Sequence, residues 1–329
     1  MKAVIWTKYG PPEVLQLTDL EKPTPKDNEI LIKIHATSVT AGDCEMRGMK
    51  VGLLYRIFMR LYIGLLKPKR IKILGMELAG EIEKVGKDVG SFKEGEKVFA
   101  ATDFLHIGTY TEYICLPVES KDLFIAKMPN NASFEEAATV PVGGLEALNY
   151  IGNENVTKGQ KVLVNGAGGT IGTFAVQLAK HFGAEVTGVD STMKLDTLRS
   201  IGIDRVIDYT QENFADSGEK YDVILDVVGK RPFSDFKKSL KKDGLLLFAN
   251  PKVSYLIRGK FSRVRVKAGT SKQKTEDLLY LRELIEAGKL RSVIDKTYPL
   301  DQVVEAHKYV ETGQKKGHVV ISIDIEKLS

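Results

Sequence analysis

Cysteine is scarce in this sequence. Cys44 and Cys115 are the only two, and they stand far apart. Two isolated cysteines support neither a disulfide framework nor a CxxC metal motif. The five histidines show no spacing typical of metal ligands. The sequence therefore predicts a protein of a reducing compartment without a cysteine-based metal site.

Long hydrophobic runs are also missing. The most apolar stretch, residues 52–66, contains Arg56 and Arg60 and falls short of the roughly 20 residues that cross a bilayer. The first residues, MKAVIWTKYG, lack the apolar core of a secretory signal. We therefore expect a cytoplasmic protein without a transmembrane helix.

Acidic residues are absent from two intervals of the chain. Eight Lys or Arg and no acid lie between Glu45 and Glu77, and eight more lie in residues 252–274, although the net charge is only +5. Such runs can attract phosphates, nucleic acid or anionic lipid, but a solvated face is the commoner explanation. We expect no nucleic-acid partner.

The remaining pattern predicts two structural units, as the length of 329 residues suggests. Short apolar runs separated by turn residues fill the first hundred or so positions, which is typical of an antiparallel β unit. From about Ser133, strands alternate with helices, and this alternation predicts a parallel, doubly wound α/β sheet. The helices are expected at 135–148, 171–182, 193–200, 232–240 and 276–287.

Two final strand-like runs, residues 293–297 and 318–323, resemble the β unit at the start. A chain that leaves one unit, completes a second and returns would place both termini in the same domain. A cleft between two such domains is a favoured ligand site.

A glycine-rich turn lies between a predicted buried strand, residues 161–165, and a predicted helix. Gly166 allows the tight turn, Gly169 lets the backbone approach a pyrophosphate, and Gly172 lets the helix pack on the strand. The phosphates would lie at the positive N-terminus of the helix. The predicted dinucleotide-binding residues of this turn are Gly166, Gly168, Gly169, Thr170, Ile171 and Gly172.

The second strand of this unit ends at Asp190, 18 residues after Gly172. An acid at this place accepts hydrogen bonds from the adenosine ribose, and it would repel a 2′-phosphate. Ser191, Thr192 and Lys194 could instead bind that phosphate. The residues alone leave NAD(H) and NADP(H) both open.

At this point the chain resembles the medium-chain dehydrogenase/reductase superfamily, and within it the zinc-independent quinone oxidoreductases and enoyl-type reductases. The resemblance spans essentially the whole chain. It is carried by the glycine turn and by residues 38–43, 74–80, 95–99, 141–145 and 206–209.

The resemblance implies a GroES-like β domain of residues 1–123 and 290–329 and a Rossmann domain of residues 124–289. It also implies a homodimer, and it favours NADP(H), with Lys194 and Tyr209 matching positions that contact the adenosine phosphate side. The zinc ligands of the alcohol dehydrogenases in this superfamily correspond here to Thr40, Met76 and Val142. These three side chains cannot build a zinc tetrahedron, so no metal is expected.

Without a Lewis acid, reduction of an electron-poor quinone or enone is favoured over alcohol oxidation. We therefore predict hydride transfer to a small lipophilic quinone or conjugated carbonyl, with hydrogen-bond donors meeting the oxyanion. The candidate catalytic residues are Thr40, Tyr110 and Asp43, although Tyr110 could equally be a packing aromatic. Asp43 and Arg47 could form an ion pair, and the Cys44 thiol is expected to be buried and inert.

Two further segments bear on ligand binding. Val227 and Asn250 each follow a strand of the parallel sheet, at the edge where such sheets bind ligands. Residues 53–66 read as an amphipathic helix with Arg56 and Arg60 on one stripe. This helix is either a wall for a bulky substrate or, through residues 53–70, a weak contact with a membrane surface.

Two other functions remain compatible with the sequence. One is a metal-free alcohol or aldehyde dehydrogenase, which would need a proton relay. The other is a non-catalytic NADPH-binding redox sensor that contacts RNA or a membrane through the basic runs.

Overall fold

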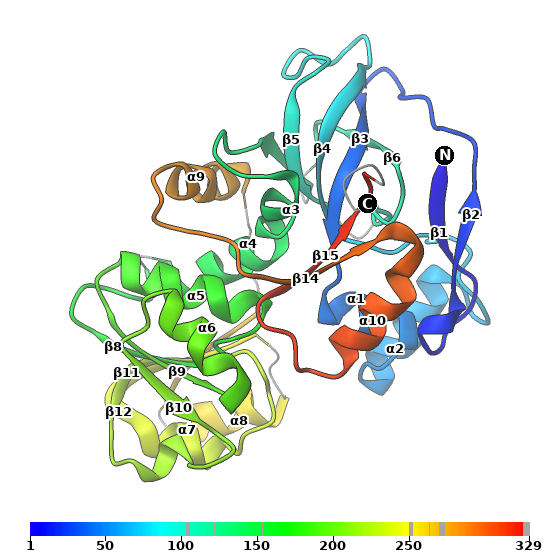
Figure 1. Cartoon of the computed structure of the whole chain (residues 1–329). Helices are drawn as coiled ribbons and strands as arrows, with labels where there is room; N and C mark the ends of the chain where they lie inside the picture. Colours follow the sequence, from blue (N-terminus) through cyan, green and yellow to red (C-terminus); the bar gives the residue numbers. More distant parts are fainter. Residues whose placement is uncertain are drawn as a thin grey trace. The chain divides into compact units, whose positions relative to one another are not determined.

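The computed structural model describes residues 1–102, 106–120, 123–152, 154–249, 253–262, 264–269 and 274–324 (Figure 1). The chain forms two compact units. The first comprises Met1–Val142, Lys274–Glu286 and Ile294–Ser329, and the second comprises Gly143–Gln273 and Ala287–Val293. Both ends of the chain therefore belong to the first unit.

The boundary between the units differs from the predicted one at residue 124. Strand β7 (Phe124–Lys127) pairs with β5 (Lys97–Ala101) in the sheet of the first unit. Helix α9 (Thr275–Glu286) contacts β7 and therefore also belongs to the first unit. The prediction had assigned both elements to the second unit because their place depends on pairing with distant strands.

A seven-stranded sheet forms the centre of the first unit. Its long strand β3 (Glu29–Ser38) pairs with β4 (Glu77–Val85), β6 (Tyr113–Pro117) and β15 (His318–Ser322), all antiparallel. Strand β14 (Ile294–Pro299) adds to β15 in parallel at one edge. A separate two-stranded sheet joins β1 (Lys2–Trp6) to β2 (Leu15–Asp19). The alternating apolar residues of these strands fill one hydrophobic core.

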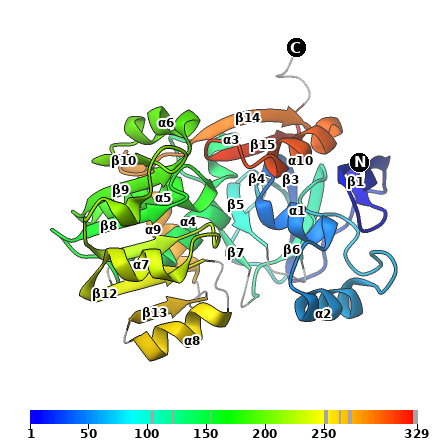
Figure 2. The same cartoon turned by 90° about the horizontal axis from the view of Figure 1, so that it is seen from below.

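Two helices from opposite ends of the chain pack together in the first unit. Helices α1 (Ala41–Gly48) and α10 (Val303–Glu311) contact each other and lie side by side in Figures 1 and 2. The contact ties the segment after β3 to the C-terminal segment. Helix α2 (Leu53–Ile63) follows α1, and none of the described helices is both long and apolar enough to span a membrane.

The helix predicted for residues 135–148 is two helices in the structure. Helix α3 (Phe134–Ala137) ends before Thr139, and α4 (Val140–Ile151) begins with Pro141 in its first turn. Proline has no N–H to donate to the carbonyl four residues earlier, so one continuous helix cannot form here. The single-helix prediction was wrong because it followed the apolar period and neglected this proline.

The second unit contains a parallel six-stranded sheet with the order β10-β9-β8-β11-β12-β13. Because the first strand of the unit is central, the chain winds outward in both directions from it, which is the doubly wound order that was predicted. Its strands are β8 (Lys161–Asn165), β9 (Glu185–Asp190), β10 (Arg205–Asp208), β11 (Tyr221–Asp226), β12 (Leu240–Phe248) and β13 (Arg265–Ala268).

Helices cover both faces of this sheet (Figure 2). Helices α5 (Thr170–His181) and α6 (Leu195–Ser200) connect β8 to β9 and β9 to β10. Helices α7 (Phe233–Ser239) and α8 (Val253–Ser262) connect the strands on the other side of β8. Right-handed crossovers in opposite directions place the two pairs on opposite faces.

Candidate functional site

The glycine turn of the second unit joins β8 to α5. Gly166 has a φ of +89°, a conformation that residues with a side chain rarely adopt. A Cβ on Gly172 would lie 2.1 Å from the carbonyl oxygen of Gly166, so only glycine lets α5 approach the turn this closely. These two positions have the geometric roles that the motif predicts.

Gly169 caps the N-terminus of α5 without any side-chain hydrogen bond. A Cβ built on it would meet only the Gly166 carbonyl oxygen, at an ordinary 3.5 Å, so the space in front of this residue is open. The helix dipole and the first-turn N–H groups make such an end favourable for an anion. The donor set at the turn therefore fits a pyrophosphate.

Asp190 ends β9 and is almost fully buried. One of its carboxylate oxygens accepts a hydrogen bond from the Gly168 N–H at 2.8 Å. The other accepts one from the Ser191 N–H at 2.9 Å and lies 3.3 Å from the Lys194 ammonium. The Lys194 charge therefore compensates the Asp190 charge in the folded protein.

Gly168 has a further role that sequence reasoning missed. A Cβ at this position would lie 2.8 Å from a side-chain carbon of Lys194 and 3.1 Å from the Asp190 carboxylate. The glycine thus admits the ion pair beside the turn. Tyr209, the other residue predicted on the adenosine side, follows β10 with a half-exposed ring, and its N–H donates to the Asp190 carbonyl.

The carboxyl ends of β8 and β11 are braced by Asp226, which was not among the predicted residues. Its buried carboxylate accepts from the Asn165 side chain at 2.8 Å and from the N–H of Gly229 at 3.2 Å. Val227 follows Asp226, and its N–H donates to the Asn165 carbonyl. Asn250, also predicted on this edge, lies outside the described residues.

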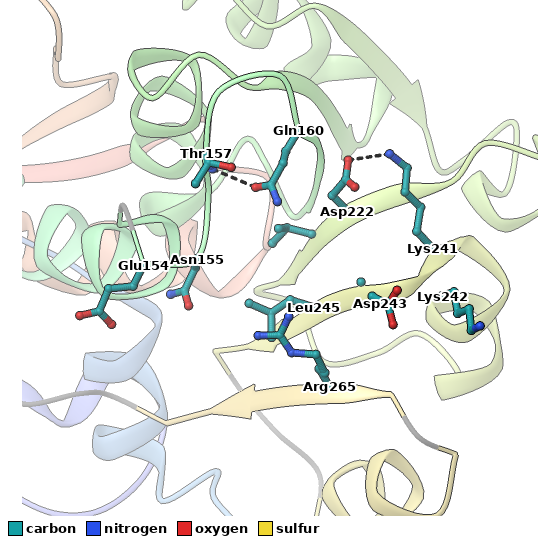
Figure 3. A pocket seen from close by; sticks show the side chains of 12 residues that line it. Glu154, Asn155, Thr157, Gln160, Asp222, Lys241, Lys242, Asp243, Leu245 and Arg265 are labelled. Atoms are coloured by element: carbon teal, nitrogen blue, oxygen red, sulfur yellow. Dashed lines mark hydrogen bonds and ion pairs between the residues drawn. The ribbon is translucent and has the colours of Figure 1, made fainter.

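A separate cavity of about 490 Å³ lies at the other end of the same sheet (Figure 3). Gln160 and Arg265 line it where β8 and β13 begin, whereas the glycine turn follows the end of β8. Its wall includes the ion pair of Asp222 and Lys241, whose charges cancel. We therefore do not assign the dinucleotide to this cavity.

In the first unit, Thr40 and Asp43 form a reciprocal capping box at the start of α1. The Thr40 hydroxyl lies 2.6 Å from one Asp43 carboxylate oxygen, and the Thr40 N–H donates to the same oxygen at 2.8 Å. The Asp43 N–H in turn donates to the Thr40 hydroxyl at 3.2 Å. The structure therefore brings these two predicted catalytic residues into direct contact.

Asp43 is fully buried, and burial raises the pKa of its carboxyl above the usual range despite the hydrogen bonds from Thr40 and Gly75. Tyr110 is also fully buried, and its ring meets the His307 ring edge-on. Burial first and the nearby Asp43 charge second raise the pKa of the Tyr110 phenol well above its usual value. No described residue gives this hydroxyl a hydrogen bond of good geometry.

Glu77 is the second buried carboxyl of this region. It accepts hydrogen bonds from the Ser38 hydroxyl and, at 2.7 Å, from the Val142 N–H. Burial raises the pKa of Glu77 to about 7, and the Asp43 charge adds to the effect. We refer to Ser38, Thr40, Asp43, Glu77 and Tyr110 as the buried polar cluster.

The proposed ion pair between Asp43 and Arg47 does not form among the described residues. Arg47 points instead toward α10, where it lies 2.8 Å from Glu311 and donates to His307 at 2.9 Å. Residues four apart share a helix face, but the carboxyl partner supplied by α10 could not be read from that spacing. Burial and Arg47 hold the pKa of His307 down, at about 3.

Cys44 lies beside this network and is a buried thiol, as predicted. Its sulfur is 3.3 Å from a ring nitrogen of His307. Burial and the Asp43 charge raise its pKa to about 12, so the thiolate is not populated near neutral pH. The residue therefore has a packing role.

The positions that correspond to zinc ligands carry groups of other chemistry. Thr40 is a helix cap bonded to Asp43, the Met76 carbonyl accepts from Thr102, and the Val142 backbone binds Glu77. Within the described ranges, no three or more His, Cys, Asp or Glu side chains are grouped as a metal site would require.

Comparisons with known proteins agree with this architecture. A family model described as an alcohol dehydrogenase GroES-like domain matches residues 26–130, and one described as a zinc-binding dehydrogenase matches residues 201–321. A 2-methylene-furan-3-one reductase of Solanum lycopersicum is 34% identical over 98% of this chain and 79% of its own length. The chloroplastic NADPH-dependent alkenal/one oxidoreductase of Arabidopsis thaliana is 32% identical over 98% and 79%.

The solved structure of the quinone oxidoreductase from Coxiella burnetii superposes with a TM-score of 0.87 at 30% identity, covering 98% of this chain and 99% of that one. The fold and the glycine turn define a two-domain dehydrogenase or reductase. The chain belongs to the medium-chain dehydrogenase/reductase superfamily, in the branch of quinone oxidoreductases and enoyl reductases.

Proposed function

We propose that this protein is an NAD(P)H-dependent reductase that transfers a hydride to a quinone or an α,β-unsaturated carbonyl without a metal. The observation that carries the proposal is the glycine turn from Gly166 to Gly172, with an uncapped helix N-terminus and open space at Gly169. The names of the reductases to which the chain is similar support the same class of substrate.

The reaction needs a hydride and a proton. A bound dihydronicotinamide supplies the hydride, and a quinone becomes a hydroquinone when one further proton is added. For an enone, the hydride enters at the β-carbon and the proton completes the saturated carbonyl. The protein must therefore bind the developing oxyanion and deliver a proton to it or replace that proton from water.

Thr40 and Asp43 are suited to that task. With Asp43 ionised, the hydroxyl hydrogen of Thr40 is directed at the carboxylate 2.6 Å away. With Asp43 protonated, the carboxyl can donate to the Thr40 oxygen, and the Thr40 hydrogen is free for the substrate oxygen. Burial raises the pKa of Asp43 and so increases the share of the protonated form, in which Thr40 is the donor and Asp43 its proton source.

Tyr110 acts through Asp43 in this proposal, as a positioning residue. Its hydroxyl is fully buried, so contact with a substrate would require a rearrangement of the core. Its buried ring instead fills the space beside Gly75, where a Cβ would lie 2.8 Å from a Tyr110 ring carbon. The tyrosine thereby packs against Gly75, whose N–H donates to Asp43, and so helps to position that carboxyl.

We propose NADP(H) as the preferred cofactor. Asp190 is engaged by Gly168, Ser191 and Lys194 and is about 5% exposed, so it has little capacity left to accept two ribose hydroxyls. The same ion pair reduces the repulsion that Asp190 would exert on a 2′-phosphate. Lys194 and Ser191, together with the half-exposed Tyr209, then supply the donors for that phosphate.

The substrate in this proposal is small and lipophilic, and the protein is a cytoplasmic homodimer. The dimer and the location rest on family expectation and sequence composition, and light scattering on the purified protein tests the first of them.

The experiment that tests the function is a titration with NADPH and NADH, followed by turnover with a soluble quinone and with a linear enal, each with and without a chelator. We expect binding and turnover that the chelator leaves unchanged. Binding without turnover on either acceptor would favour the redox-sensor alternative. A parallel assay supplies a primary alcohol with NADP+ or NAD+ as the hydride acceptor; oxidation of the alcohol there, without acceptor reduction in the first assay, would favour the dehydrogenase.

A further inference from the structure

Helix α2 of the first unit carries an unusual number of exposed apolar side chains. Its apolar side chains face solvent, with Leu54 84% exposed, Phe58 62% exposed and, just after the helix, Leu66 86% exposed. The other large apolar side chains exposed here are Leu53, Tyr55, Ile57, Leu61 and Leu65. Scattered exposed apolar residues are common, but a continuous set of this kind marks an interaction site.

The helical period separates this outer face from the side that packs on the protein. Leu54, Phe58, Ile57 and Leu61 are three or four residues apart and share one side of α2. Met59, on the other side together with Ile63, is buried in the core of the first unit. The helix is therefore anchored by its inner side, while its outer apolar side chains face solvent.

Basic residues follow the apolar helix along the chain. Lys67, Lys69 and Lys72 line a groove of about 580 Å³ directly after the helix, and they form no ion pair with any described residue. Arg56 is exposed on α2, and the chain has no acidic residue between Glu45 and Glu77. We call residues 53–72 the apolar-basic face.

We propose that the apolar-basic face docks on the surface of a bilayer that contains anionic phospholipid. The apolar side of α2 would enter the boundary between headgroups and acyl chains, and the lysine groove would take the headgroup phosphates. The observation behind the proposal is the direct succession of an exposed apolar helix and a groove with three lysines that form no ion pair with any described residue.

Other occupants fit less well. Nucleic acid would satisfy the lysines, but it offers no apolar phase for Leu54 and Phe58. A second copy of this chain, related by a twofold axis, would bring the same basic groups together and would be opposed by their repulsion. An anionic bilayer matches both the apolar and the charged components of the face.

The experiment is flotation of the full-length protein with vesicles of phosphatidylcholine alone or of phosphatidylcholine with phosphatidylglycerol. We expect binding to the anionic vesicles, weak binding to the neutral ones, and release as the salt concentration rises. Binding that is independent of both lipid charge and salt concentration, or no binding to either kind of vesicle, would overturn the proposal.

Two sets of variants locate the contact. The double variant Leu54→Ser/Phe58→Ser removes apolar area from the face and should weaken vesicle binding by at least about tenfold. Its matched control is Leu17→Ser/Leu20→Ser, which removes two exposed leucines from elsewhere in the first unit. Equal loss in both pairs would contradict the assignment.

The charge variant is Lys67→Gln/Lys69→Gln/Lys72→Gln, which should weaken binding on the order of 100-fold, because each lysine near an anionic surface contributes about fivefold. The control Lys33→Gln/Lys84→Gln/Lys237→Gln removes the same charge from exposed sites and should have little effect.

Two further readouts separate the alternatives. Turnover of a water-soluble quinone should be unchanged in Leu54→Ser/Phe58→Ser, so a loss of turnover with intact vesicle binding would assign α2 to a substrate pocket instead. Tight binding of a single-stranded RNA that is unchanged in Leu54→Ser/Phe58→Ser, together with no binding to vesicles, would make nucleic acid the partner. Vesicle binding is measured without turnover, so its result does not depend on the proposed reductase activity.

Discussion

The glycine turn and the buried polar cluster carry the two halves of the proposed chemistry, and they are built in different ways. The turn uses seven consecutive residues, Gly166 to Gly172, and a single distant carboxylate, Asp190. The cluster draws Thr40, Glu77 and Tyr110 from three separated segments. A site made from consecutive residues is set by local backbone geometry, whereas a dispersed site depends on how strands pair and helices pack.

The largest expected effect is at the open position of the turn. Gly169→Asp should weaken NADPH binding by about 1,000-fold or more, because a carboxylate would stand where the pyrophosphate approaches. A fluorescence titration measures the change. The unfolding midpoint should stay near that of the wild type, since a Cβ at Gly169 meets only one atom at 3.5 Å.

A contrasting variant in the same turn sharpens this prediction. In Gly172→Ala the new Cβ would lie 2.1 Å from the Gly166 carbonyl oxygen, so the variant should lose folding stability before it loses affinity. Undiminished NADPH binding by Gly169→Asp would contradict the assignment of the cofactor to this turn.

The next largest effect is a dependence of folding stability on pH, caused by Glu77 of the buried polar cluster. The pKa of Glu77 rises from 4.5 to about 7 on folding because the carboxyl is buried. The folded protein therefore retains a proton that the unfolded chain releases, and the free energy of unfolding should fall by up to about 3 kcal/mol between these pH values. Above about pH 7 no further loss is expected from this group.

Glu77→Gln should remove the Glu77 part of this dependence, because the amide is neutral throughout and can still accept from Val142 and donate to Ser38. The buried Asp43 carboxyl keeps its own part. Denaturant unfolding at a series of pH values compares the two proteins. If both lose stability in parallel between pH 4.5 and 7, another group is responsible.

The next largest effect is expected on kcat, when the Thr40 hydroxyl is removed. Thr40→Val should lower kcat by about 100-fold, because the oxyanion loses its donor, while the Kd for NADPH stays the same. Asp43→Asn should also lower kcat and flatten its pH profile, since the amide can donate a hydrogen bond to Thr40 but cannot supply a proton. Thr111→Val, another buried threonine, serves as the control. Unchanged kcat in Thr40→Val would exclude this hydroxyl from the reaction.

The smallest expected effect is on cofactor choice. Lys194→Ala should reduce the preference for NADPH over NADH by about tenfold, because the 2′-phosphate loses an ammonium and faces the uncompensated Asp190 charge. Lys180→Ala, which removes an ammonium from the last turn of α5, is the control. If the affinities for NADPH and NADH fall equally in Lys194→Ala, Lys194 is only a structural partner of Asp190.

Much of the second unit could be predicted because its signals are local. The strand predicted at residues 161–165 is β8, and the second strand, β9, ends at Asp190 as predicted. The Asp190 carboxylate was expected near the turn, but its ion pair with Lys194 was not. The spacing of four residues allowed the contact without deciding whether Lys194 would point toward the acid or toward solvent.

The first unit was harder to predict because its contacts join distant segments. Arg47 was expected to pair with Asp43 and instead reaches Glu311, 264 residues away. Nothing in the local pattern marks His307 as its neighbour. The outer face of α2 is a similar case, since its amphipathic pattern left a pocket wall and a surface helix both open.

The sequence by itself determined the family, the doubly wound parallel sheet and the place of the glycine turn. These follow from alternation, turn residues and helix ends, which act over a few neighbouring residues. Only the tertiary structure decided the partners of Asp43, Arg47 and Asp190 and the exposure of α2. Burial and charge pairing depend on which segments meet in space, and that is fixed by packing of the whole unit and not by any one segment.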